Sequence, residues 1–437
     1  MCGMKLIAME TSFCFAAAST RRPFRTMCGG AFFAMATIAA CTAWGGADDG
    51  PGTFFEPAAG TGNAVAVVAA PTNAVTQRRV AFLGGSITEM DGFRPLVMKA
   101  LRARFPDVSF VEIAAGLSST CSDAGAFRLE EEVLSKGVPD LLVAEFAVND
   151  DQDGGFDRSR CVRGLEGVLR RMRLANPQAA LVVGLFVNKG QYDQLLRGET
   201  PLPYAAHAAV AKHYGAAVAD VGSALAASAK AGGMDWSVYR DCHPSPEGCR
   251  MAAKVVEAAI DRVFDPRTQA KAQPLPPPLD ATSYFASRRV PNAAISSPDG
   301  GWTLAQPAWS KIPGHVRAHD RVGEVWSSCT AGAALEVSFT GTTLAAYMTT
   351  GPDAGALEVS IDGGAPRLLK FRGWGDLHYP FAAILAEGLT DGPHRARLVV
   401  REDRRDGKPT STIRLHRLYE NGLLAAVRRD SREACRR

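Results

Sequence analysis

Short apolar runs alternate with helical patterns from Arg79 to about Phe264, and this alternation constrains the fold more than any other feature of the chain. The runs are apolar on both faces, as parallel strands buried between two helix layers are. Strands are predicted over 80–83, 109–113, 140–146, 180–187 and 216–221, and helices over 94–104, 123–135, 161–174, 204–214 and 246–263. Ser122 is expected to cap the second helix. The pattern predicts a three-layer α/β/α sandwich with a parallel sheet and right-handed crossovers.

The segment Gln273–Leu279 (QPLPPPL) interrupts this alternation. Proline continues neither a helix nor a central strand, so we expect a domain boundary here. Beyond it the apolar period becomes two, as in Leu335–Phe339, and turn signals such as Asp362-Gly363-Gly364 separate the runs. The expected division is an α/β domain at 78–266, a Pro-rich linker at 267–290, and an all-β sandwich at 291–437.

The first residues are typical of an export signal. Three arginines among residues 21–25 precede the apolar run 31–40, which is shorter than the roughly 20 residues that cross a bilayer. The run ends at Cys41, and two interpretations stay open: a bacterial lipoprotein signal that is acylated at Cys41, or plain cleavage near Ala47.

The net charge of the chain and its predicted leader limit the partners that we expect. Lys and Arg number 49 against 45 Asp and Glu, and most of this small surplus lies in the first 41 residues, so we expect no nucleic-acid partner. We expect residues 1–41 to be a signal peptide and 42–77 a linker. A membrane contact is expected only through a lipid at Cys41. The protein would then be exported from a bacterial cell to the periplasm, the outer membrane or the medium.

Six cysteines lie beyond the leader, at positions 121, 161, 242, 249, 329 and 435. None has the C-x-x-C spacing of a zinc or redox site, so no metal is predicted. Cys242 and Cys249 either form a disulfide, which an exported chain permits, or remain free thiols.

Ser86 lies where the first predicted strand gives way to a loop, in Gly84-Gly85-Ser86-Ile87-Thr88. Ligands of open α/β sheets gather beyond the carboxyl ends of the strands. A serine becomes a good nucleophile only beside a base. His243 precedes the last predicted helix in Asp241-Cys242-His243-Pro244, where Asp241 can orient the ring. Each motif alone also fits an ordinary turn or helix start.

Asn149 follows another predicted strand, in Glu145-Phe-Ala-Val-Asn149-Asp150. An amide there can donate to a developing oxyanion, a contact worth about 3 kcal/mol. An ordinary turn is the alternative. The acidic run 150–155 lacks the distal Glu of a calcium loop, so we expect a solvated loop.

Taken in order, these motifs resemble the four sequence blocks of the GDSL-like, or SGNH, hydrolases. The resemblance extends over about Val80–Val263. The segments that resemble the blocks are 84–88, 114–120, 147–150 and 241–244.

The resemblance implies a fold and a set of site residues. The sheet would be of the SGNH, or flavodoxin-like, type. Ser86 would be the nucleophile, His243 the base and Asp241 its orienting acid. The oxyanion hole would comprise the Ser86 N–H, the Ser119 N–H and the Asn149 side chain, and no cofactor would be needed.

Two positions depart from the family pattern. Ser119 stands where the family usually has glycine, so its side chain narrows the pocket. The acid usually stands three residues before the histidine, but here Arg240 occupies that place and Asp241 stands two residues before it. Asp235 is the alternative acid.

The family includes lipases, thioesterases, phospholipases and carbohydrate O-acetylesterases, so its catalytic residues do not identify the substrate. The β-rich tail resembles the jelly-roll module of some carbohydrate esterases. This resemblance and export favour a serine esterase that removes acetyl or other short acyl groups from a carbohydrate. A lipase or thioesterase, an acyltransferase and a non-catalytic glycan-binding protein stay open as alternatives. The aromatic residues that can stack on sugar rings are Trp302, Trp309, Trp326, Trp374 and Tyr379.

Overall fold

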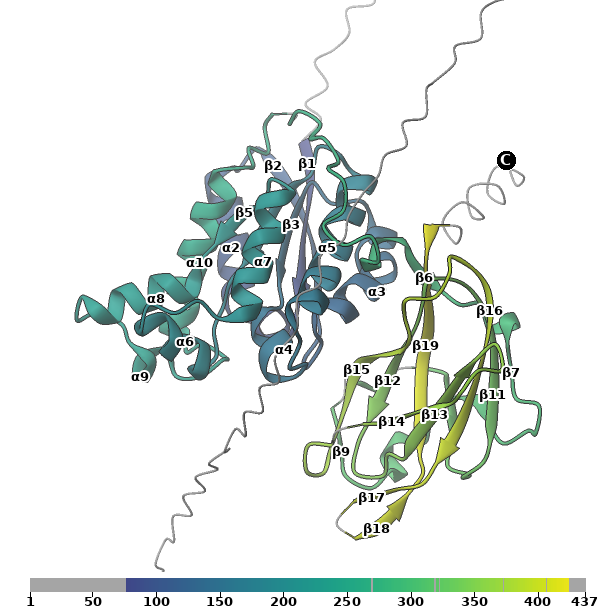
Figure 1. The fold of residues 1–437 in the computed structure, drawn as a ribbon. Helices are drawn as coiled ribbons and strands as arrows, with labels where there is room; N and C mark the ends of the chain where they lie inside the picture. The colour runs from purple at the N-terminus through teal and green to yellow at the C-terminus, as the bar shows by residue number, and fades with distance from the viewer. Residues whose placement is uncertain are drawn as a thin grey trace, which may run out of the picture. The chain divides into compact units, whose positions relative to one another are not determined.

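The computed structural model describes residues 76–268, 270–317, 320–321, 323–371, 373–405 and 407–423 (Figure 1). The predicted leader, Cys41 and Cys435 lie outside these residues. Within the described ranges, every helix is too short or too polar to cross a membrane.

A parallel sheet forms the centre of the first domain. Its strands are β1 (Thr76–Gly84), β2 (Val108–Gly116), β3 (Leu141–Glu145), β4 (Ala180–Gly184) and β5 (Ala217–Ala219). Their order is β2-β1-β3-β4-β5, with every pairing parallel. All residues of β3 and β4 are buried, as expected of strands covered on both faces. The predicted flavodoxin-like α/β/α sandwich is confirmed.

Helices cover both faces of this sheet. They are α1 (Ser86–Glu89), α2 (Phe93–Arg104), α3 (Ser122–Glu132), α4 (Ala147–Gln152), α5 (Arg158–Ala175), α6 (Lys189–Leu196), α7 (Leu202–His213), α8 (Val221–Lys230), α9 (Trp236–Tyr239) and α10 (Pro246–Asp261). α5 packs against α3 and α7, whereas α2 packs against α10 (Figure 1). Right-handed crossovers produce these two layers, because the chain reverses its direction across the sheet after β2.

The predicted long helices lie within a few residues of α2, α3, α5, α7 and α10. The predicted cap of α3 was wrong, since Cys121 is the N-cap and the Ser122 hydroxyl donates to Asp150 instead. The helices α1, α4, α6, α8 and α9 were not predicted, because they have only four to ten residues and leave little periodic pattern in the sequence.

The Pro-rich segment runs against the α/β domain. Pro276 O accepts a hydrogen bond from Arg170 of α5, and the N–H groups of Leu279 and Asp280 both donate to the buried Glu166. The segment is irregular because proline prevents regular structure, yet side chains of the first domain satisfy its backbone.

The second domain is rich in β-strands. They are β6 (Ser287–Arg289), β7 (Ile295–Ser296), β8 (Thr303–Ala305), β9 (His315–Val316), β10 (Val325–Ser328), β11 (Ala334–Gly341), β12 (Thr343–Thr350), β13 (Ala356–Ile361), β14 (Arg367–Lys370), β15 (Leu377–Ala386), β16 (Gly392–Arg401), β17 (Asp403–Arg405), β18 (Lys408–Thr410) and β19 (Ile413–Asn421).

Two sheets make up most of this domain. One has the order β8-β10-β19-β12-β15-β9, with β6 also on β19, and the other has the order β14-β13-β16-β11-β7. Apolar residues such as Leu335, Leu357, Leu398 and Leu415 are fully buried in one core cluster with residues of both sheets. The predicted β-sandwich after the α/β domain is confirmed.

A cluster of aromatic rings joins the two domains. Phe127 of α3 lies 5.0 Å from the ring of Tyr284 and stacks at 5.5 Å on Tyr419 of β19. All three side chains are buried and belong to the hydrophobic core of the α/β domain. The junction is therefore an extension of that core.

We expect Phe127→Ala to lower the free energy of unfolding by about 3 kcal/mol, because it leaves a cavity between Tyr284 and Tyr419. Leu174→Ala, on an exposed part of α5, is the control and should change it by less than about 0.5 kcal/mol. Urea unfolding monitored by fluorescence measures both. A loss below about 1 kcal/mol for Phe127→Ala would show that the cluster contributes little.

Candidate active site

The strand order of the parallel sheet determines where the candidate residues meet. β1 lies between β2 and β3, so the chain leaves the carboxyl ends of β1 and β3 in opposite directions. The crevice at such a switch point is where ligands of this architecture bind. Ser86 follows β1, and Asn149 follows β3.

Ser86 and His243 are in direct contact. The distance from Ser86 Oγ to His243 Nε2 is 2.7 Å, although the two residues are 157 positions apart in the sequence. The loop that carries His243 is held between α9 and α10, because Ser245 caps α10 and its backbone N–H donates to Tyr239 O. A serine hydroxyl and an imidazole at this distance can exchange a proton.

The two candidate acids differ in their surroundings. Asp241 Oδ1 lies 3.7 Å from His243 Nδ1, beyond hydrogen-bond distance, and it accepts a hydrogen bond from the backbone N–H of His243. Asp235 instead caps α9, where its carboxylate accepts from the backbone N–H groups of Ser237 and Val238. Of the two, Asp241 is the acid beside His243. It is 53% exposed, so water screens its charge.

Asn149 is buried directly behind the nucleophile turn. A Cβ atom on Gly85 would lie 2.0 Å from Asn149 Oδ1, so the position before Ser86 has no room for a side chain. One amide hydrogen of Asn149 is already used in a hydrogen bond, since Nδ2 donates to Asp153 Oδ2 at a distance of 2.7 Å. Nδ2 carries a second hydrogen, which this bond leaves available.

Ser119 adopts a conformation that favours glycine. Its φ angle is 63°, in the left-handed region, which costs an ordinary residue about 1 kcal/mol. Hydrogen bonds hold the turn on both sides of it: Leu117 N–H donates to Gly84 O, and Thr120 N–H donates to Leu117 O. The left-handed backbone of Ser119 is thus the conformation that glycine adopts readily, and glycine is usual at this position in the family that the chain resembles.

Asp150 corrects one prediction. The acidic run was expected to be a solvated loop, but Asp150 is fully buried at the end of α4's first turn. It accepts from the Ser122 N–H and hydroxyl and lies 2.9 Å from His207 Nε2. These bonds tie the helix that carries Asn149 to the start of α3, just after Ser119.

Two clusters among the described residues combine possible metal ligands: Asp150 with Cys161 and His207, and Asp241 with Cys242 and His243. In the first cluster Asp150 already bonds Ser122 and His207, and in the second His243 Nε2 faces Ser86. Cys242 and Cys249 are free thiols, so the disulfide alternative was wrong.

Two carboxyl groups of the site were missed from the sequence. Asp153 accepts a hydrogen bond from Asn149. Burial raises the pKa of Asp153, although the hydrogen bonds from Asn149 and Gln152 act to lower it. Glu145 lies under the turn that carries Ser86, and burial raises its pKa to about 7. The one sequence feature that could have indicated a role for Glu145 is its position as an ionisable residue at the end of a predicted strand. Asp153 could not be told apart from the other acidic residues of the run 150–155.

Ser119 and Asp153 line a cleft of about 330 Å³, whereas Ser86, Asn149 and His243 do not. Its other wall comes from β14 and β15 of the second domain and includes Lys370, Phe371 and Tyr379. The ring of Trp374, 47% exposed, lies 5.9 Å from the ring of Tyr379. Trp302 and Trp309, which sequence reasoning also considered for sugar stacking, are buried.

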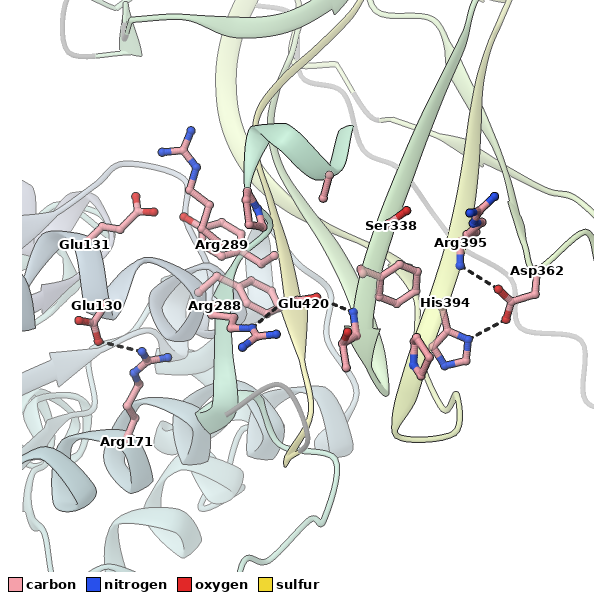
Figure 2. Close-up of a pocket in the computed structure, with 17 residues that line it drawn as sticks. Glu130, Glu131, Arg171, Arg288, Arg289, Ser338, Asp362, His394, Arg395 and Glu420 are labelled. Carbon is pink, nitrogen blue, oxygen red and sulfur yellow. Dashed lines mark hydrogen bonds and ion pairs between the residues drawn. The ribbon is translucent and has the colours of Figure 1, made fainter. Parts of the chain in front are cut away.

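A larger cavity lies elsewhere. It has a volume of about 880 Å³ and is bounded by residues of α3, α5, β6, β11, β16 and β19 (Figure 2). Ser86, Asn149 and His243 do not line it. Its carboxylates are engaged in the ion pairs Glu130–Arg171, Glu131–Arg417, Glu420–Arg288 and Asp362–His394. Size therefore does not identify the catalytic site in this chain.

Comparison with protein families gives a match over residues 82–251, to the GDSL-like Lipase/Acylhydrolase family. These residues contain Ser86, Ser119, Asn149 and His243. A comparison with curated protein sequences gives no match.

Solved structures with a similar fold include esterases. A two-domain esterase (CEX) active on acetylated mannans, also crystallised with mannopentaose, has a TM-score of 0.64 and 22% sequence identity. The alignment covers 80% of this chain and 92% of that one. Axe2, an acetylxylan esterase from Geobacillus stearothermophilus, has a TM-score of 0.35 and 17% identity, over 43% of this chain and 95% of that one.

The family match and the fold agree with the sequence resemblance. The matched residues contain the parallel sheet with Ser86 and His243 in contact. Residues 82–251 of the chain thus match the GDSL-like Lipase/Acylhydrolase family model, and a β-rich domain follows them.

Proposed function

We propose that the protein is an exported serine esterase that removes acetyl or other short acyl groups from a carbohydrate through an acyl-enzyme. The observation that carries this proposal is the 2.7 Å contact between Ser86 Oγ and His243 Nε2, next to the buried carboxamide of Asn149. A nucleophile, a base and an amide donor together are the groups that acyl transfer needs.

In the first half-reaction, His243 Nε2 takes the proton of Ser86 as Oγ attacks the ester carbonyl. Negative charge develops on the carbonyl oxygen. The N–H groups of Ser86 and Ser119 and the second amide hydrogen of Asn149 stabilise it. As the ester C–O bond breaks, His243 gives its proton to the departing sugar oxygen, which leaves as a hydroxyl, and the acyl group stays on Ser86 Oγ.

In the second half-reaction, His243 removes a proton from water, which attacks the acyl-enzyme. The same donors stabilise the second tetrahedral intermediate, and its collapse returns the proton from His243 to Ser86. Asp241 favours the transient imidazolium by its charge, but weakly, because it is half exposed and 3.7 Å from Nδ1.

Three observations support a short acyl group on a carbohydrate. Ser119 lines the cleft and has a side chain where the resembled family usually has glycine, which leaves less room for a long acyl chain. The cleft combines the charged side chains Arg367, Lys370 and Glu387 with aromatic rings, as sugar-binding surfaces do. A protein of the same two-domain fold is an esterase active on acetylated mannans, so acetylated mannan is the first substrate to try.

We expect Ser86→Ala to lower acetate release from acetylated mannan at least about 10³-fold, because it removes the nucleophile. Ser237→Ala, which replaces a serine near His243 on α9, should stay within about twofold of the parent. Enzymatic assay of free acetate measures both. Equal turnover by Ser86→Ala and the parent would refute the serine mechanism, and preference for nitrophenyl octanoate over acetate would refute the short acyl group.

We expect Asp241→Asn to lower kcat about tenfold, far less than the roughly 10⁴-fold loss for a buried triad acid, because Asp241 is exposed and distant from Nδ1. Asp235→Asn should leave kcat unchanged. Steady-state kinetics with nitrophenyl acetate tests both variants. A larger loss of kcat in Asp235→Asn than in Asp241→Asn would assign the acid to Asp235.

We expect Trp374→Ala to raise the KM for acetylated mannan about fivefold, because stacking on an aromatic ring contributes roughly 1 kcal/mol. The KM for nitrophenyl acetate should stay unchanged, since this small ester is too short to reach Trp374 from Ser86. Trp302→Phe, a buried and conservative change, is the control. An unchanged KM for the polymer would exclude Trp374 from substrate binding.

A further inference from the structure

We infer that Glu145 is a positioning residue: its carboxylate holds the turn that carries Ser86 so that the Ser86 N–H stays free to donate to the oxyanion. This inference deepens the proposed function and rests on it. Glu145 touches neither Ser86 Oγ nor His243 in the described structure, so its effect would pass through the turn.

The contacts of Glu145 converge on one oxygen. Glu145 Oε1 accepts from the backbone N–H of Gly85 at 3.0 Å, the backbone N–H of Thr88 at 3.2 Å and the Thr88 hydroxyl at 2.7 Å. These donors lie on both sides of Ser86 in the sequence. These hydrogen bonds attach the start of α1 to the carboxyl end of β3, where Glu145 is the last residue.

The pattern of bonds leaves one N–H free. The first amides of a helix have no partner within the helix, and Glu145 binds two of those near the nucleophile. No described atom accepts from the N–H of Ser86, which lies between them. That N–H is the donor that the proposed mechanism needs.

Gly84 shows how closely Glu145 fits. A Cβ atom on Gly84 would lie 2.3 Å from Glu145 Oε1 and 2.3 Å from Thr88 Oγ1. The chain therefore approaches the carboxylate without an intervening side chain, and a residue other than glycine would displace the turn.

The groups around Glu145 favour its ionised form only in part. Arg128 of α3 adds a positive charge while its guanidinium donates to Gly84 O and Ala115 O. Tyr239 of α9 is buried nearby, and its hydroxyl bonds no described atom. On the side of β4, the neighbour of Glu145 is Gly184, which has no side chain and therefore no charge that could shift the pKa of Glu145.

Burial, the largest influence, raises the pKa of Glu145 to about 7, whereas the bonds from Thr88 and Gly85 and the charge of Arg128 lower it. A protonated Glu145 would need an acceptor for its O–H. The second oxygen, Oε2, is buried and bonds no described atom. We therefore expect protonation to loosen the bonds to Gly85 and Thr88, so that the turn is held best above neutral pH.

The test compares Glu145→Gln with Glu166→Gln. Glu166 is also buried and accepts from two backbone N–H groups, but it lies on α5, where it binds the Pro-rich segment. Glu145→Gln should lower kcat at least about tenfold at pH 8, with KM within about twofold, because a displaced nucleophile slows attack without changing substrate contacts. The rate at which a fluorophosphonate labels Ser86 should fall in parallel. Glu166→Gln should change neither rate more than about twofold.

The pH profile separates positioning from a merely structural role. In the parent, activity needs a neutral base and an ionised Glu145, so log(kcat/KM) should fall more steeply than a slope of one just below neutral pH, until the slower form with protonated Glu145 prevails. In Glu145→Gln the slope should be one. A slope of one in the parent, or parent-like kcat and labelling in Glu145→Gln, would overturn the inference.

A second variant serves if Glu145→Gln does not fold. Thr88→Val removes the hydroxyl that donates to Glu145 and keeps the shape of the side chain, so the acid limb should move to higher pH and stay steeper than a slope of one. An unmoved limb would overturn the inference. A parent without turnover and without labelling would instead overturn the proposed function, so the two failures are distinguishable.

Discussion

The reversal of strand order at β1 and β3 is the constraint on which the rest of the site depends. It brings the ends of two adjacent buried strands to one crevice, so the chain segments after them diverge and leave room for a ligand. Ser86 leaves one strand and Asn149 the other. His243 arrives from the far end of the domain, on the loop between α9 and α10. A few buried strands thus position residues that are remote in sequence.

Buried carboxylates connect these pieces. Glu145 binds the turn before and after Ser86, and Asp150 binds the start of α3 just after Ser119. Asn149 lies between them on the same segment. Such groups are expensive to bury unless several donors surround them, and each of the two accepts at least two hydrogen bonds. The segment 145–150 therefore contains Asn149 and bonds the backbone next to Ser86 and Ser119, so it positions all three proposed oxyanion donors.

Much of this could be predicted from the sequence, for identifiable reasons. Strands that are apolar on both faces revealed the parallel sheet, and the Pro-rich break revealed the change to period two. Ser86, His243 and Asn149 could be found because their motifs follow strands or precede a helix. The burial of Asp150 could not be predicted, because a run of acidic residues resembles a solvated loop until tertiary contacts are known. The choice between Asp241 and Asp235 also depended on tertiary structure, since both precede His243 closely and only the capping of α9 separates them.

The most direct test of the central claim is a crystal structure of the full chain after reaction with a phosphonate that mimics the tetrahedral intermediate. The account predicts phosphorus bonded to Ser86 Oγ, with one phosphonyl oxygen about 2.7 to 3.1 Å from Ser86 N, Ser119 N and Asn149 Nδ2, and with His243 Nε2 still beside Oγ. An adduct on another residue, or a phosphonyl oxygen that points away from all three donors, would contradict it.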